Sequence, residues 1–218
     1  MAYSQKQTFE YPAHNDVPAA IKKVLKESGQ KKLYWVSHSG GGHLALMHLA
    51  RKPEYQEKFA GLVTLGAQAT DGAMGFKYKT RALFLWGLTR LFGQFPEAIA
   101  TATVGTEGEP TRLLAQWSKW NIKKKWQGGD GFDYMSGLST LTVPALMLAG
   151  SKDDIAPTTG CKKFFDAMGS DDKSWLVFSQ ANGHSKDFTH GQLIRGSAAQ
   201  QDVYPHISDW ITKRNSQS

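Results

Sequence analysis

One serine in the chain has the neighbours that a nucleophile needs. Ser39 follows the short apolar run 33–36 and precedes 40–51, a stretch rich in leucine and alanine. A strand, a tight turn and a helix in this order form the sharp turn that holds a serine hydroxyl above the end of a sheet. Small residues two positions before and after the serine let strand and helix approach each other, and Ser37 and Gly41 stand there. The first of these positions is usually glycine, so Ser37 is a conservative departure.

A glycine-rich turn after a strand can also bind phosphate. A phosphate-binding loop would carry Lys followed by Ser or Thr after its glycines, whereas His43-Leu44 stands at that place. The interpretation as a nucleophile is therefore preferred. It requires an acid and a base elsewhere in the chain, because a serine alone is a weak nucleophile.

Asp153 is the candidate acid. It follows the apolar run 143–148 in the pattern Gly150-x-x-Asp153. Active groups of parallel sheets cluster beyond the carboxyl ends of the strands, so an aspartate after one strand can lie near a serine after another. Its neighbour Asp154 is the fallback, because Asp153 fits the spacing from Gly150 better.

Two histidines are candidates for the base. His184 and His190 both follow the apolar run 175–178, and either imidazole could take the proton of Ser39 while the acid orients it. His184 stands in a Gly-His pair soon after the strand, whereas His190 opens a longer pattern. Other histidines, including His38 inside the serine motif, have no comparable support.

These motifs resemble those of the α/β-hydrolase superfamily, and within it those of esterases and acid-lipase-like hydrolases. They are Ser37-His38-Ser39-Gly40-Gly41, Gly150-x-x-Asp153 and a terminal run from His190 to Trp210. The order Ser, Asp, His is the order expected in this superfamily. In acid-lipase-like hydrolases the catalytic histidine opens the closing segment, which favours His190 over His184.

The resemblance implies an enzyme, a serine hydrolase that cleaves carboxylic esters. Ser39 would attack the acyl carbon, His190 would transfer the proton, Asp153 would orient the imidazole, and the backbone N–H of Gly40 would hold the oxyanion. A second interpretation is a non-catalytic or weakly active truncated hydrolase-fold protein that acts as a binding or oligomeric module.

The elements that must position these residues alternate along the chain. Helix and strand patterns in alternation indicate an α/β class with a parallel sheet and right-handed crossovers. We expect strands over 33–36, 60–65, 143–148 and 175–178 and helices over about 17–28, 40–51 and 203–211.

The middle of the chain has a different pattern. Residues 66–141 contain no obvious strand but many aromatic residues, among them those of 76–92 and 113–126. We therefore expect a hydrolase core formed by 1–69 and 141–218 and a helical cap formed by 70–140. Apolar walls favour apolar ligands, so this cap indicates a small apolar ester as the substrate.

The stretch before the serine motif is short for this fold. About 32 residues precede the run 33–36, and they hold one helix pattern. A typical member has further strands there, together with the source of a second oxyanion donor. We therefore expect a reduced number of strands, with 33–36 exposed at the edge of the sheet. Such an edge favours pairing with a second copy, unless the amino-terminal segment covers it.

Charge and composition exclude some functions. The net charge is +7, which could favour anionic partners such as nucleic acid. The basic residues are scattered, however, except for Lys123-Lys124-Lys125, which lies between Trp120 and Trp126. We interpret this run as a solvated helix face and expect no nucleic-acid partner. No apolar run is long enough for stable membrane insertion.

Cofactors and cellular compartment have weaker signals. The single cysteine, Cys161, excludes an intrachain disulfide and fits a reducing compartment. The first residues hold no apolar run typical of a signal peptide, so we expect a cytoplasmic protein. The chain has no HExxH pattern or paired metal ligands at short spacing, and the chemistry implies neither a metal nor an organic cofactor.

Overall fold

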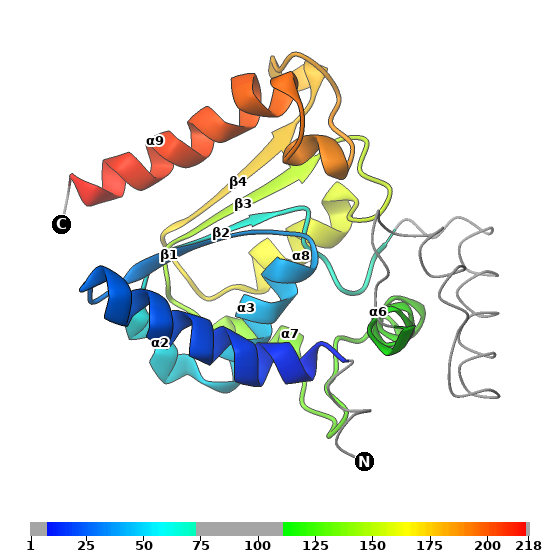
Figure 1. The fold of residues 1–218 in the computed structure, drawn as a ribbon. Coiled ribbons are helices and arrows are strands. Elements are labelled where there is room, and N and C mark those ends of the chain that lie inside the picture. The colour runs from blue at the N-terminus through cyan, green and yellow to red at the C-terminus, as the bar shows by residue number, and fades with distance from the viewer. Residues whose placement is uncertain (1–7, 73–110, 217–218) are drawn as a thin grey trace.

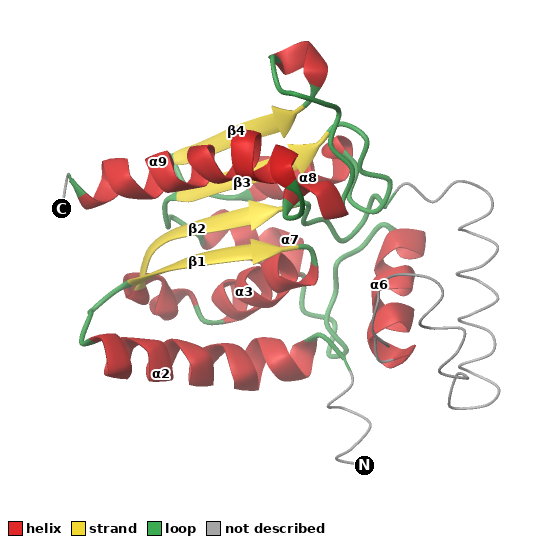
Figure 2. Cartoon of the chain, turned by 45° about the horizontal axis from the view of Figure 1, so that its top comes forward, coloured by secondary structure: helices red, strands yellow, loops and turns green. Residues whose placement is uncertain are grey.

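The fold is a four-stranded parallel sheet flanked by helices, in the order β1-β2-β3-β4 (Figure 1). The computed structural model describes residues 8–72 and 111–216. The strands are β1 (Leu33–His38), β2 (Phe59–Leu65), β3 (Ala145–Gly150) and β4 (Lys173–Phe178). All three neighbouring pairs are parallel, and Figure 2 shows the arrows pointing the same way. The expected α/β class is confirmed.

Helices cover both faces of this sheet (Figures 1 and 2). The α-helices are α2 (Val17–Ser28), α3 (Gly40–Arg51), α6 (Thr111–Lys123), α7 (Tyr134–Gly137), α8 (Thr158–Ala167) and α9 (Tyr204–Asn215). Short 3-10 turns lie at Pro53–Lys58, Leu138–Thr140, Gln180–Asn182 and Gly191–Leu193, and π-helical turns lie at Pro12–Asp16 and Ala199–Val203. Local sequence explains the bounds of α2, because Pro18 stands in its first turn and Gly29 ends it with φ +68°.

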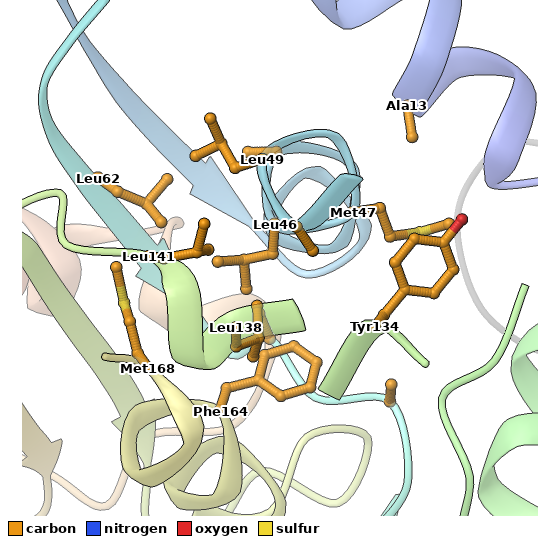
Figure 3. Close-up of a cluster of buried hydrophobic side chains, with 14 of the residues drawn as sticks. Ala13, Leu46, Met47, Leu49, Leu62, Tyr134, Leu138, Leu141, Phe164 and Met168 are labelled. Atoms are coloured by element: carbon orange, nitrogen blue, oxygen red, sulfur yellow. The ribbon is translucent and has the colours of Figure 1, made fainter. Parts of the chain in front are cut away.

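Successive residues of a strand pack into two different hydrophobic clusters, one on each face of the sheet. Leu62 and Met147 belong to the larger cluster, which also contains residues of α2, α3, α7 and α8. Figure 3 shows Leu62 together with Leu46 of α3, Tyr134 of α7 and Phe164 of α8. Their neighbours Val63 and Leu148 point into the second cluster, which Val203 joins from the approach to α9. Because successive side chains of a strand point to opposite faces, each face of the sheet packs against one layer of helices.

Several expected boundaries are wrong by two residues or more. Strand β1 ends at His38 rather than at 36, β4 begins at Lys173 rather than at 175, and α9 continues to Asn215 rather than ending at 211. The run 143–148 predicts a strand that begins earlier than β3, which starts at Ala145. Pro144 has no N–H to donate to the ladder, although its carbonyl accepts from Leu62 N–H at 2.8 Å. The first N–H that this run donates to a neighbouring strand is therefore that of Ala145, to Asp172 O at 2.9 Å.

Part of the expected cap falls outside the described residues, including the aromatic stretch 76–92. Its later part forms α6, which lies off the carboxyl ends of the strands in both views (Figures 1 and 2). Trp120 and Trp126 are 2% and 1% exposed, so they do not form an open stacking surface for bases. Lys124 donates to Thr70 O at 2.8 Å, so this lysine contacts the loop after β2 rather than solvent alone.

Strand β1 lies at one end of the described sheet. It pairs with β2, and Val36 at its centre is 49% exposed. Tyr34 is covered by the edge of the Trp210 ring from α9. Within 8–72 and 111–216, no helix combines the length and apolarity needed to cross a bilayer.

Candidate active site

Ser39 occupies a strained turn between β1 and α3. Its backbone has φ +53° and ψ −121°, a conformation that residues with a side chain rarely adopt. Its N–H donates to Leu65 O at 2.8 Å, and its carbonyl accepts from Gly42 N at 3.0 Å. Strain at a single residue persists where surrounding bonds hold it, and such positions concentrate at functional sites.

The small residues around Ser39 are needed because strand and helix lie very close together. A Cβ added to Gly41 would stand 3.2 Å from Ser37 Cβ. One added to Gly42 would stand 2.7 Å from Ala67 Cβ, which is closer than real side chains approach. Serine at position 37 fits because Gly41 leaves room for its Cβ, and its hydroxyl donates to Val63 O at 3.2 Å.

Asp153 and His190 form a buried pair at the carboxyl end of the sheet. The imidazole Nδ1–H of His190 donates to Asp153 Oδ2 at 2.7 Å. The Asp153 side chain is 0% exposed and that of His190 is 15% exposed. The other oxygen of Asp153 accepts from the N–H of Ile155 at 2.9 Å and of Ala156 at 2.7 Å. Since both oxygens are bonded, the carboxylate holds the imidazole in one orientation and one tautomer.

Gly66 connects this pair to the serine turn. It directly follows Leu65, the acceptor of the Ser39 N–H. A Cβ added to Gly66 would lie 3.0 Å from Asp153 Oδ2 and 3.1 Å from His190 Nδ1. The backbone of Ser39 is therefore bonded to Leu65, and the pair of Asp153 and His190 lies beside the next residue along the chain, Gly66.

The alternative candidates lie apart from this contact. His184 Nδ1 lies 3.1 Å from Ser179 O, and its ring packs against Phe178 and His206. Asp154 is exposed. The geometry thus brings His190, rather than His184, to Asp153.

Sequence reasoning missed His38. Its Nε2–H donates to the backbone carbonyl of His190 at 3.0 Å, and the two rings have centroids 4.4 Å apart. Burial, followed by the nearby His190, lowers the pKa of His38 to about 4. The available signal was its place at the end of β1, directly before Ser39. Nothing in the sequence shows that the backbone of residue 190 lies close to it.

Two glycines were also missed. Gly66 has φ +59°, and its place directly after an apolar strand was a usable signal. In the sequence, Gly150 served only to mark the position of Asp153 in the pattern Gly150-x-x-Asp153, but the structure gives this glycine a further role. A Cβ there would lie 2.3 Å from Phe188 O, so glycine lets the segment that carries His190 cross the end of β3.

The cysteine of the chain, Cys161, is buried away from solvent. Cys161 is 3% exposed, its thiol donates to Ala156 O at 3.3 Å, and burial raises its pKa. This environment makes it a packing residue rather than a nucleophile. In the part of the chain that the structure describes, no group of three or more His, Cys, Asp or Glu residues could hold a metal ion.

Known proteins with similar sequences include several lipases and a poly(3-hydroxyalkanoate) polymerase subunit, all matched over short segments. No protein-family model matches the chain. It is 29% identical over 101 residues to lipase member N of Homo sapiens, which is 46% of this chain and 23% of that protein. It is 34% identical over 77 residues to gastric triacylglycerol lipase of Bos taurus, 35% of this chain and 18% of that protein. The matches thus span about a quarter or less of these relatives.

Solved structures are similar over almost the whole chain. A monoacylglycerol lipase from Paleococcus ferrophilus has a TM-score of 0.63 at 16% identity, over 95% of this chain and 76% of that one. A soluble variant of monoglyceride lipase from Saccharomyces cerevisiae has a TM-score of 0.64 at 15% identity, over 92% of this chain and 68% of that one. An esterase from Thermogutta terrifontis has a TM-score of 0.60 at 16% identity. The chain has the fold of the α/β-hydrolases.

Proposed function

We propose that the chain is a serine hydrolase that cleaves carboxylic esters through an acyl-enzyme. The observation that carries the proposal is the convergence, on consecutive residues at the end of β2, of the strained Ser39 and the buried pair of Asp153 and His190. Nucleophile, base and orienting acid are the groups that acyl transfer by serine requires. The names of the similar proteins, lipases and esterases, support the same class of reaction.

In the first half of the reaction, Ser39 Oγ attacks the acyl carbon while His190 Nε2 takes the hydroxyl proton. The tetrahedral intermediate then expels the alcohol, which receives the proton from His190, and the acyl group stays on Ser39. In the second half, His190 takes a proton from water, the hydroxide attacks the acyl-enzyme, and the acid leaves as Ser39 regains its proton. Proton transfer of this kind contributes about 10²–10⁴ in rate.

The start of α3 would stabilise the negative oxygen of the intermediate. Gly40 is the first residue of this helix, and the first N–H groups of a helix have no acceptor within it. They also lie at the positive end of the helix dipole. Removing one such donor in other enzymes costs about 10²–10³ in rate, so Gly40 N–H carries a substantial part of the proposed catalysis.

The proposed substrate is a small ester with an apolar acyl group, bound under a helical cap formed by 70–140 and packed on a core of 1–69 and 141–218. Two ion pairs join residues of the proposed cap to the proposed core. Asp130 pairs with Arg51 of α3 at 2.6 Å, and Asp71 pairs with Lys163 of α8 at 2.7 Å.

The test is hydrolysis of a short-chain p-nitrophenyl ester by the wild type and by Ser39→Ala, His190→Ala and His184→Ala. We expect Ser39→Ala and His190→Ala to lose at least about 10³ in kcat, because both act in the same steps. His184→Ala should keep kcat close to that of the wild type and is the matched control.

Equal turnover by the wild type and Ser39→Ala would exclude the proposal. Loss in His184→Ala with activity kept in His190→Ala would assign the base to His184. A folded wild type without turnover on any tested ester would favour the alternative, a binding or oligomeric module with an inactive triad.

A further inference from the structure

The proposed base lies in a stretch with little regular structure. Between β4 and the turn at Ala199–Val203, the segment around His190 contains only short 3-10 turns. Irregular segments are held by individual contacts rather than by a ladder of hydrogen bonds. The position of the His190 ring relative to Ser39 therefore depends on the contacts that fix this segment.

The ring and the backbone carbonyl of His190 are bonded to different parts of the chain. Its ring is held by Asp153 through Nδ1, at 2.7 Å. Its backbone carbonyl accepts from His38 Nε2–H at 3.0 Å. The contact with Asp153 sets the direction of the ring, whereas the contact with His38 sets where the backbone stands.

His38 is also joined to the proposed nucleophile by a single peptide bond. It is the last residue of β1, where it pairs with Leu65, and Ser39 N–H bonds to Leu65 O at 2.8 Å. The His38 ring thus connects the rigid end of the strand that presents Ser39 to the segment that presents the base. A shift of about 1 Å between such groups can cost 10² in rate.

The surroundings of His38 keep its ring in one protonation state at neutral pH, and so keep its hydrogen bond to the His190 carbonyl. The groups facing the His38 ring are His190, Asp153 and Arg195, and burial is the main reason that its pKa falls to about 4. The ring is then neutral, and Nε2 carries the proton because it faces a carbonyl oxygen. A neutral ring also places no positive charge beside His190 when His190 takes the proton of Ser39.

We propose that His38 is a positioning residue, which fixes the backbone of His190 at the correct place relative to Ser39 through its hydrogen bond to the His190 carbonyl. The proposal rests on the proposed function for its kinetic consequence. The hydrogen bond itself, and its effect on the pair of His190 and Asp153, do not depend on turnover.

The test compares His38→Gln, whose amide N–H can replace the Nε2–H donor, with His38→Phe, which keeps a ring but cannot donate. The first readout is the low-field proton NMR resonance of His190 Nδ1–H, assigned by its loss in Asp153→Ala. The second is kcat and KM for the p-nitrophenyl ester. His206→Phe, at an exposed histidine on α9, is the matched control.

We expect His38→Phe to lose or broaden the resonance and to lower kcat roughly 10-fold to 100-fold with little change in KM. His38→Gln should keep the resonance and most of kcat, as should His206→Phe. If His38→Phe does not fold, His38→Ala, whose smaller side chain cannot clash, takes its place in the same comparison.

An unchanged resonance and unchanged kcat in the variant without a donor would overturn the proposal, as would an equal loss in His38→Gln. Failure of the proposed function is recognised separately, because Ser39→Ala would then hydrolyse the ester as fast as the wild type. In that case the NMR resonance alone still decides whether His38 fixes His190.

Discussion

At the scale of residues, the geometry of the site depends on one position without a side chain. Gly66 has φ +59°, and its Cα faces the hydrogen bond between His190 and Asp153. A methyl group there would meet the carboxylate and the imidazole at 3.0–3.2 Å, so one of them would have to move. Replacing this glycine is therefore a way to displace the pair without changing its chemistry.

We expect Gly66→Ala to lower kcat for ester hydrolysis by about 10-fold or more, because the base and its acid are pushed out of line. Stability should fall by roughly 1–3 kcal/mol, the cost of a side chain in a left-handed conformation. The measurements are steady-state kinetics and urea unfolding.

The control for this variant is Gly29→Ala. Gly29 has φ +68°, but nothing lies within 4 Å of its added Cβ. It should lose similar stability and keep full activity. Equal activity in Gly66→Ala and Gly29→Ala would contradict the role assigned to Gly66.

The sequence predicted that Asp153 and His190 belong together, which their hydrogen bond agrees with, but it did not predict everything that they touch. Ser39, Asp153 and the two histidines His184 and His190 could be chosen because each follows a strand pattern, and parallel strands share one carboxyl edge. Only the resemblance of the terminal segment favoured His190 over His184. The contact of His38 with His190 could not be predicted, because it depends on the path of the irregular segment after β4. Such a path is set by tertiary packing, for example by the passage of Phe188 across Gly150.

At the scale of elements, local signals were strong where a proline or glycine marks an end. The expected helix 17–28 is confirmed by α2, since Gly29 takes the left-handed conformation that ends a helix. The expected strand 60–65 is confirmed by β2 to within one residue. The start of β3 was wrong because pairing depends on the neighbouring strand and not on apolar content alone. The division into core and cap stays a prediction.

Strand β1 is one of the two edge strands of the described sheet, and β4 is the other. Exposed edges offer unpaired N–H and C=O groups to another strand, and proteins often protect them with charged residues. The centre of β1 instead carries Val36, which is 49% exposed. We propose that two copies of the chain associate through this edge.

Val36→Lys should weaken that association, because a charge on the edge opposes pairing with a second copy. Sedimentation velocity should show a concentration-dependent dimer for the wild type and a monomer for the variant. Val24→Lys is the matched control, since Val24 on α2 is also 49% exposed. A wild type that remains monomeric, with amides 33–36 protected from hydrogen exchange, would contradict edge pairing.

At the scale of the whole molecule, the larger core contains a histidine among apolar and aromatic side chains. His43 is 2% exposed, and its ring contacts those of Phe9, Trp126 and Phe164. Burial lowers its pKa to about 4 from the ordinary 6.5. Between these two values the unfolded chain binds the proton and the folded chain does not, so acid favours unfolding.

We therefore expect the free energy of unfolding to fall as the pH falls from about 6.5 to 4, with about 3 kcal/mol attributable to His43. His43→Gln, which keeps a donor but cannot titrate, should reduce the slope between pH 4.5 and 6 by up to about 1.4 kcal/mol per pH unit. Urea unfolding at several pH values measures this slope. The control is His206→Gln, at an exposed histidine, which should keep the wild-type slope. An unchanged slope in His43→Gln would contradict the prediction, because it would mean that His43 has the same pKa in the folded and the unfolded chain.

The central claim is that Ser39 is a nucleophile activated by His190. A fluorophosphonate forms a covalent adduct with such a serine, and peptide mass spectrometry locates it. The account predicts one adduct, on Ser39, which is absent in Ser39→Ala and forms at least about 10²-fold more slowly in His190→Ala. An adduct on another residue, or equal labelling of Ser39 with and without His190, would contradict it.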